Sequence, residues 1–258
     1  MTWTFDAERE IEHIVNWIKD YFVKNGPNSK AVIGISGGKD STIAAALCVR
    51  ALGPERVYGV LMPQGVQSDI GDAYAVCQAL GIAHCEINIE NIVNDLYYEI
   101  DRGYDFDHSV KNNPVVTTNT PARIRMTTLY AISAVVGGRV CNTCNRSEEV
   151  VGYSTKFGDN AGDFAPIQEY TVRELLLIGD ALTELPSNLV HKTPADGMCG
   201  KSDEDNLGFT YEELDAYILD NIYPSYDKYL LIKEKYKANQ HKRLNLPHCC
   251  PLKNTFSF

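Results

Sequence analysis

Short apolar runs alternate with longer segments of helical periodicity in the first ninety residues of this chain. The runs at 31–35, 57–62 and 84–89 predict strands, and the segments 42–52 and 69–80 between them predict helices. The runs are continuous rather than alternating, as expected for strands that are buried on both faces of a parallel sheet. The pattern therefore predicts an α/β fold of the doubly wound type, with a mostly parallel sheet and helices on both faces.

Further helices are predicted before and after this unit. Near the N-terminus, Ile11, Ile14, Ile18 and Phe22 recur with the helical period. Pro121 follows Thr120 and predicts a helix that starts there and runs to about residue 136, since the missing N–H of proline is harmless at the first helical position. Each of these helices offers an apolar face that can cover the sheet.

The second half of the chain carries weaker signals. Residues 139–142 are a candidate fourth strand. Thr171 with Glu174, and Thr210 with Glu213, have the spacing of a capping box and predict two helix starts. Residues 191–208 show no periodicity, so we expect a functional loop there.

Composition bounds the class of protein. At 258 residues without a linker, we expect one domain over 1–258. A net charge of −10 argues against a broad basic face for nucleic acid. The sequence has no run of about 18 apolar residues, which predicts no membrane span, and its N-terminus does not resemble a signal peptide. The eight cysteines are therefore expected as reduced thiols in a cytoplasm.

The strongest chemical signal is the segment Ser-Gly-Gly-Lys-Asp-Ser at 36–41, which we call the phosphate loop. It follows a predicted strand and precedes a helix, so its backbone N–H groups and the helix N-terminus can bind an anion. It is neither a Walker A loop nor a GxGxxG motif. Asp40 is an acid inside this anion site, which is explained if Mg²⁺ bridges Asp40 to phosphate.

This loop resembles the pyrophosphatase loop of the N-type ATP pyrophosphatases, which cleave ATP between the α- and β-phosphates and adenylate an oxygen of the substrate. Segments at 121–130, 142–163, 191–208 and 241–243 further resemble the NAD synthetase family, in the family's order. The resemblance implies an adenine nucleotide alpha hydrolase-like fold. It also implies a ligase that amidates deamido-NAD (nicotinic acid adenine dinucleotide) with ammonia through an acyl-adenylate, releasing AMP and pyrophosphate.

The resemblance also assigns residues to ligands, with ATP as co-substrate and Mg²⁺ as cofactor. The implied ATP-binding residues are Gly34, Ile35, Ser36, Gly37, Gly38, Lys39, Asp40, Ser41, Thr143 and Ala195. The implied deamido-NAD-binding residues are Arg123, Lys156, Asp163, His241 and Lys242. The implied Mg²⁺ ligands are Asp40 and Glu148. No side-chain nucleophile is expected, so catalysis would consist of positioning and charge neutralisation.

The resemblance leads to two further expectations. We expect a homodimer, and ammonia as the direct donor because no segment resembles a glutamine amidase domain. Two positions depart from the family pattern. Ala195 stands where many members have a hydroxyl that contacts ATP, and Val172 stands where some have a lysine that does so. Either ATP affinity is lower, or donors such as Lys192 compensate.

Two other functions stay open at this point. Cys141 and Cys144 beside an ATP loop also resemble the tRNA thiolases. That role needs further thiolates, for which Cys199, Cys249 or Cys250 would serve. It also needs a basic surface for tRNA, which this acidic chain does not offer. A non-catalytic adenine-nucleotide-binding protein on the same fold is the other alternative. It would have no use for Asp40 and Glu148 together.

Overall fold

The computed structural model describes residues 4–103, 109–192 and 202–243. Four strands form one sheet in the order β3 (Ala83–Glu86), β2 (Val57–Leu61), β1 (Lys30–Gly34) and β4 (Gly138–Val140). All three neighbouring pairs are parallel. After β1 the chain forms β2 and β3 on one side of β1, and β4 later pairs with the other side of β1. The carboxyl ends of β1 and β4 therefore form the switch point at which doubly wound folds bind ligands.

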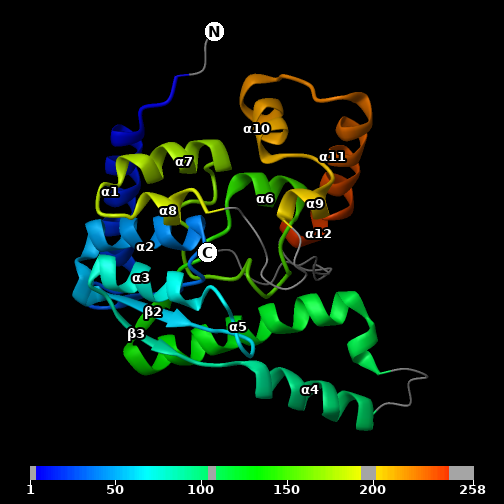
Figure 1. Ribbon diagram of the computed structural model, residues 1–258. Coiled ribbons are helices and arrows are strands. Elements are labelled where there is room, and N and C mark those ends of the chain that lie inside the picture. The colour runs from blue at the N-terminus through cyan, green and yellow to red at the C-terminus, as the bar shows by residue number, and fades with distance from the viewer. Residues whose placement is uncertain (1–3, 104–108, 193–201, 244–258) are drawn as a thin grey trace, which may run out of the picture.

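Helices cover both faces of the sheet, as predicted (Figure 1). On one face α2 (Lys39–Leu52) contacts β1 and β2 and packs against α1 (Ala7–Asn25), α3 (Ile70–Leu80), α7 (Val172–Ala181) and α8 (Ser187–Val190). On the other face α5 (Pro114–Val136) contacts β1 and β4, with α4 (Glu90–Gly103) beside it. Two 3₁₀ turns, Pro54–Arg56 and Val110–Asn112, complete this part.

The remaining helices form a second group. They are α6 (Arg146–Val151), α9 (Asp203–Leu207), α10 (Tyr211–Asp220), α11 (Tyr226–Ala238) and α12 (Gln240–Arg243). A small apolar cluster joins α6, α9, α10 and α11, with Val151, Leu207, Leu214 and Ile232 buried in it. This group places α6 close to the carboxyl end of β4.

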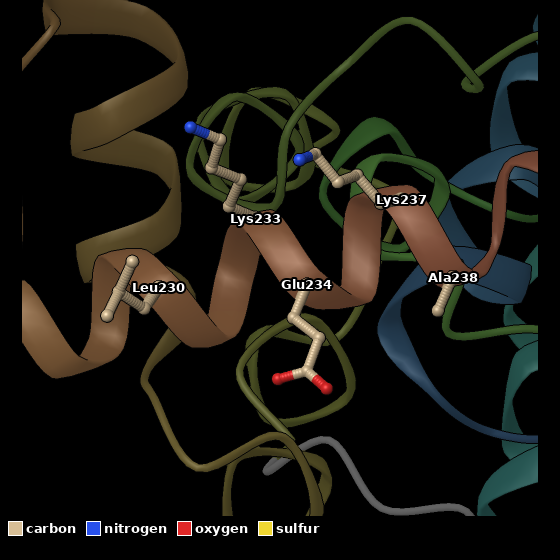
Figure 2. A pocket seen from close by; sticks show the side chains of 5 residues that line it. All are labelled: Leu230, Lys233, Glu234, Lys237 and Ala238. Atoms are coloured by element: carbon tan, nitrogen blue, oxygen red, sulfur yellow. The ribbon is translucent and has the colours of Figure 1, made fainter.

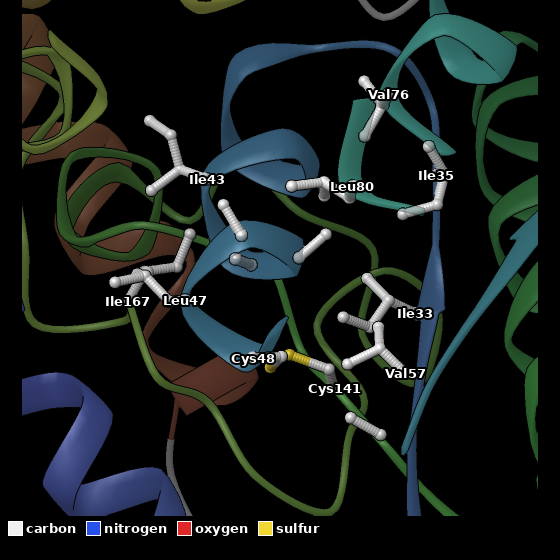
Figure 3. Close-up of a cluster of buried hydrophobic side chains, with 14 of the residues drawn as sticks. Ile33, Ile35, Ile43, Leu47, Cys48, Val57, Val76, Leu80, Cys141 and Ile167 are labelled. Carbon is white, nitrogen blue, oxygen red and sulfur yellow. The ribbon is translucent and has the colours of Figure 1, made fainter. Parts of the chain in front are cut away.

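The main core surrounds α2, which is buried on almost every side (Figure 3). Ile43 and Leu47 of α2 and Ile33 of β1 are completely buried. Complete burial of such a side chain contributes about 1.5–3 kcal/mol. The helix that begins at the phosphate loop is therefore held by the main core, which also fixes the position of the loop.

Several predicted boundaries need correction. The helix predicted from Thr120 begins instead at Pro114, where Asn113 caps it by accepting a hydrogen bond from the N–H of Val115, and Pro121 lies inside the helix. Proline does occupy the first position of this helix, as predicted, but the residue is Pro114 and not Pro121. The predicted helix 42–52 begins at Lys39, because Gly38 already serves as its N-cap.

Two strands and one loop also differ from the prediction. The strand predicted at 84–89 is β3, an edge strand of four residues with mostly exposed side chains, so it is not buried on both faces. The strand predicted at 139–142 is β4, and Cys141 adds only a single bridge to Phe164. In the predicted loop 191–208, the described residues 202–208 contain α9, which a capping box from Ser202 to Asp205 starts. The capping boxes of α7 and α10 are confirmed.

Candidate active site

The phosphate loop joins the carboxyl end of β1 to α2, and its own side chains hold it in shape. Ser36 Oγ accepts a hydrogen bond from the N–H of Gly38 at 3.2 Å, and Ser41 Oγ accepts one from the N–H of Ser36 at 3.3 Å. The two hydroxyl oxygens lie 3.0 Å apart. The loop's own hydrogen bonds thus fix its conformation at the N-terminal end of α2, where an anion is favoured.

Gly37 brings the start of α3 against the phosphate loop. Its φ is +78°, and a Cβ placed on it would lie 2.8 Å from Cβ of Asp72 and 2.9 Å from the backbone nitrogen of Ala73. Only glycine fits both the conformation and the space. The backbone at Gly37 therefore packs closely against α3.

Asp40 and Glu148, which we call the carboxylate pair, come from different elements and meet at the switch point. Asp40 lies in the first turn of α2 and Glu148 in the first turn of α6. Asn145 links them: its side-chain Nδ2 donates to Asp40 Oδ1 at 3.3 Å, and its backbone N–H donates to Glu148 Oε2 at 3.1 Å. The structure thus brings together the two residues that the resemblance implies as Mg²⁺ ligands.

Charges at the carboxylate pair are strongly coupled. Burial and the neighbouring Asp40 carboxylate raise the pKa of Glu148 well above its ordinary value of 4.5, against the opposing effect of Lys39. Burial alone would lower the pKa of the Lys39 ammonium, but Asp40 and Glu148 outweigh it and raise that pKa. Burial and the same two acids also raise the pKa of the Tyr211 phenol. The two acids therefore oppose the loss of a proton from Lys39 and from Tyr211.

The donors at this site suit Mg²⁺, which prefers oxygen ligands. Two carboxylates lie side by side, and the described residues contain no group of three or more His, Cys, Asp or Glu able to enclose a metal ion. Mg²⁺ is usually held by one or two carboxylates together with substrate phosphates and water. The chemistry of the pair therefore fits this ion beside a phosphate site.

Replacing Asn145 by Ala should test how far this link orients the carboxylate pair. The change removes the side-chain N-cap of α6, which costs about 1 kcal/mol of stability, and removes the amide donor of Asp40, while the backbone N–H of residue 145 still reaches Glu148. We expect the Mg²⁺ concentration for half-maximal AMP formation to rise about tenfold or more. Thr210→Ala is the matched control, because it removes an equivalent cap from α10 without touching the pair. Equal Mg²⁺ requirements in the two variants would contradict the orienting role.

Four of the five residues implied to bind the substrate lie close together. Arg123 Nε on α5 donates to the carbonyl of Lys156 at 3.3 Å, and Lys156 Nζ donates to the carbonyl of His241 at 2.6 Å. Lys242 Nζ donates to the carbonyls of Gly152 and Ser154, each at 2.7 Å. The residues come from α5, the segment after α6, and α12, so only the tertiary fold brings them together.

The other implied residues are placed differently. Asp163 Oδ2 accepts the N–H of Val140 at 2.7 Å and so closes the end of β4, and among the described contacts none joins it to the group above. Thr143 lies between β4 and α6, half-buried. Ala195 lies outside the described residues. Val172 is buried at the start of α7, and Arg173 Nη1 bonds Asp220 at 2.6 Å, so the Arg173 guanidinium is engaged with α10.

Cys141 and Cys144 are both buried and point to different surroundings. Cys141 lies in the main core beside Cys48 (Figure 3), whereas Cys144 Sγ contacts the carbonyl of Asp159 at 3.4 Å. Burial raises the pKa of both thiols well above the ordinary 9.0, so both are protonated at neutral pH. Protonated core thiols are poor metal ligands and poor nucleophiles, which argues against the thiolase alternative. Cys199, Cys249 and Cys250 lie outside the described residues.

Hollows in the surface do not locate this site. One of about 610 Å³ is lined by a single helix, α11, where Lys233 and Lys237 point to one side and Glu234 to the other (Figure 2). A second of about 270 Å³ is apolar and lies between the end of β3, α4 and α5. Residues of the phosphate loop line neither of them.

Sequence reasoning missed several residues that support the site. Asn145 could have been found, because Asn-x-x-Glu is a capping-box signal. Tyr211 and Asp215 could not, because both reach the site from α10, far away in the sequence. Asp215 is 1% exposed and accepts hydrogen bonds from the Ser147 hydroxyl and from the N–H of Arg173 at 2.8 Å. It thereby ties α10 to the first turns of α6 and α7.

Asp215 should make stability depend on pH. Burial raises its pKa from the ordinary 3.8 to about 6. The folded state therefore holds this proton more tightly than the unfolded state, so the stabilising contribution is present below pH 3.8 and is lost as the pH rises through 6. Relative to wild type, Asp215→Asn should gain about 3 kcal/mol in unfolding free energy between about pH 4 and about pH 7. Urea titrations at both pH values measure this change. The exposed Asp227→Asn is the control, and a pH-independent difference for Asp215→Asn would contradict the assignment.

Comparison with known proteins places the chain in a family. A model of the NAD synthase family matches residues 10–247. The chain belongs to the NAD synthase family. The NH(3)-dependent NAD(+) synthetase of Methanoregula boonei is 36% identical over 239 residues, which cover 88% of this chain and 91% of that protein. The family predicted from the sequence is confirmed by these matches.

Solved structures of the NAD synthase family share the fold of this member. The NMN synthetase of Francisella tularensis superposes with a TM-score of 0.83 at 30% identity, covering 98% of this chain and 100% of that one. The NH3-dependent NAD synthetase of Campylobacter jejuni, in complex with the nitrate ion, superposes with a TM-score of 0.75 at 28% identity, covering 96% and 100%. The doubly wound fold is thereby confirmed. No helix among the described residues is long and apolar enough to cross a membrane.

Proposed function

We propose that this protein is an ammonia-dependent NAD synthetase, which amidates the nicotinate carboxylate of deamido-NAD at the expense of ATP. The observation that carries the proposal is the carboxylate pair, which Asn145 joins beside a preformed phosphate loop at the switch point of the sheet. A carboxylate lacks a leaving group and resists ammonia. A phosphate site with a divalent cation is what its activation as an adenylate requires.

The reaction has two balanced steps. An oxygen of the nicotinate carboxylate attacks the α-phosphorus of ATP, and the bond to the pyrophosphate oxygen breaks. Ammonia then attacks the carbonyl carbon of the acyl-adenylate, the bond to the AMP oxygen breaks, and a proton leaves the nitrogen. Because no side chain forms a covalent bond, catalysis lies in positioning the reactants and in neutralising charge.

Each group of residues has a role in this proposal. The N–H groups of the phosphate loop hold the pyrophosphate portion of ATP, and Asp40 and Glu148 hold Mg²⁺. When bound, Mg²⁺ neutralises negative charge on the phosphates. Deamido-NAD binds to the side chains and backbone of Arg123, Lys156, His241 and Lys242. Asp163, at the end of β4, belongs to the same proposed substrate site. Thr143 and Ala195 complete the proposed ATP site.

The decisive experiment incubates the purified protein with ATP, deamido-NAD, ammonium chloride and Mg²⁺, followed by chromatography. Equal amounts of AMP and NAD are expected, with glutamine unable to replace ammonium. AMP without NAD would exclude the amidation step. Binding of ATP without any AMP would instead support the alternative of a non-catalytic nucleotide-binding protein.

A second candidate substrate is nicotinate mononucleotide. It is favoured by one observation, the similarity in fold to the Francisella tularensis NMN synthetase over its whole length. The amidation chemistry is the same, and only the adenylyl half of the dinucleotide is missing. The test is to compare kcat/KM for the two substrates under the same conditions. We expect deamido-NAD to be preferred, and a higher value for nicotinate mononucleotide would reassign the protein as an NMN synthetase.

We also propose that two copies of the chain, each a single NAD synthetase domain, form a homodimer in the cytoplasm. The apolar hollow between α4 and α5 supports this, because Ile92 and Ile132 line it and Ile92 is 45% exposed. Val135, also on α5, is 82% exposed. The free thiols of the described cysteines suit a reducing compartment. Light scattering coupled to gel filtration should give twice the mass of the chain.

A further inference from the structure

Lys39 lies inside the phosphate loop, yet its side chain does not face outward toward a nucleotide. It is only 4% exposed, and its ammonium bonds Asp40 Oδ2 at 2.8 Å. The ammonium also lies 5.8 Å from the centre of the Tyr211 ring. Lys39 therefore points toward α10 and α6, into the acidic interior of the site.

Three acidic residues act on this ammonium. Asp40, Glu148 and Asp203 each interact electrostatically with Lys39, and they come from α2, α6 and α9. The second Asp40 oxygen accepts from Asn145, so both oxygens of this carboxylate have a donor. The positive charge of Lys39 thus occupies the place where a divalent cation would be attracted.

We propose that Lys39 is a built-in counter-ion of the carboxylate pair, which keeps free divalent metal from binding there until ATP supplies phosphate ligands. The proposal rests on the assignment of Mg²⁺ to Asp40 and Glu148 above. One positive charge in contact with Asp40 cancels much of the attraction that the pair exerts on a cation. Phosphate oxygens restore the missing negative charge, so the metal enters together with the nucleotide.

The test measures Mn²⁺ binding to the nucleotide-free protein by electron paramagnetic resonance. Lys39→Met and Lys39→Gln remove the charge, and the Gln variant keeps a hydrogen-bond donor for Asp40 in case the Met variant does not fold. Both should bind Mn²⁺ about tenfold more tightly than wild type, or better. Lys39→Arg keeps the charge and should bind Mn²⁺ like wild type.

Two additional measurements make the result specific. Adding Asp40→Asn to the Gln variant should abolish the gain, because the metal then lacks its carboxylate. In thermal unfolding, Mg²⁺ without nucleotide should raise the midpoint of the charge-free variants and leave that of wild type almost unchanged. Mn²⁺ affinities that are equal or weaker in the charge-free variants, or an Arg variant that binds as tightly as they do, would overturn the role of Lys39.

These outcomes are separable from failure of the proposed function. If wild type makes NAD but the charge-free variants gain no Mn²⁺ affinity, only the counter-ion role is wrong. If the variants gain affinity but wild type makes neither NAD nor AMP, the amidation function is wrong and the counter-ion role stands. Absence of Mn²⁺ binding in every variant counts against the counter-ion role.

Discussion

Replacing Asp40 by Asn, or Glu148 by Gln, should abolish AMP formation, with a loss of about 10³-fold or more in turnover. Each change keeps the size of the side chain and removes one of the two charges proposed to hold Mg²⁺. Asn145 can still donate to the oxygen of the amide that replaces either carboxylate. Single-turnover formation of AMP from ATP and deamido-NAD measures the effect directly.

Glu149→Gln is the matched control, because it makes the same chemical change one residue further along α6. It should keep wild-type turnover. Far-ultraviolet circular dichroism of all three variants should match that of wild type, which separates loss of catalysis from loss of fold. Turnover near the wild-type level in either Asp40→Asn or Glu148→Gln would exclude the carboxylate pair as the metal site.

Replacing Gly37 by Ala should cost about 2 kcal/mol or more of folding stability and weaken ATP binding. The φ of +78° is unfavourable for a residue with a Cβ. The added methyl group would also lie 2.8 Å from Cβ of Asp72, which is far inside contact distance. The strain can be relieved only by moving the phosphate loop away from α3. Urea unfolding measures the first effect, and calorimetric titration with ATP measures the second.

Gly38→Ala provides the comparison for this prediction. Gly38 has a φ of −82°, which any residue adopts, and the nearest atom to an added Cβ is Ser36 Oγ at 3.3 Å. The folding stability of the Gly38→Ala variant should differ from that of wild type by less than about 1 kcal/mol. Equal destabilisation by the two substitutions would show that the positive φ and the contact with α3 do not determine the loop's conformation.

Local signals in the sequence were sufficient for the parts of the site that are close together along the chain. The apolar run before residue 36 and the Gly-Gly pair predicted a strand, an anion-binding loop and a helix. This order follows from short-range backbone preferences. The resemblance of later segments to the NAD synthetase family then paired Asp40 with Glu148, and in the structure Asn145 contacts both residues.

Where signals compete, the sequence did not decide the outcome. Both Pro114 and Pro121 are compatible with a helix start, and the cap from Asn113 favours the earlier one. The apolar run at 84–89 resembles a buried strand, yet β3 has only one neighbour and is an edge. Strand order depends on which elements pack together, and no local pattern encodes it.

By itself, the sequence determined the phosphate loop, the class of fold and the family, because these depend on residues close together along the chain or on segments in a recognisable order. The tertiary structure alone decided where the Lys39 side chain points and what surrounds it. Its ammonium belongs by position to the loop, but folding brings Glu148, Asp203 and Tyr211 around it from three other helices or their ends. The charge of a buried group depends on all its neighbours in space, so only the folded chain turns a loop lysine into the counter-ion of the carboxylate pair.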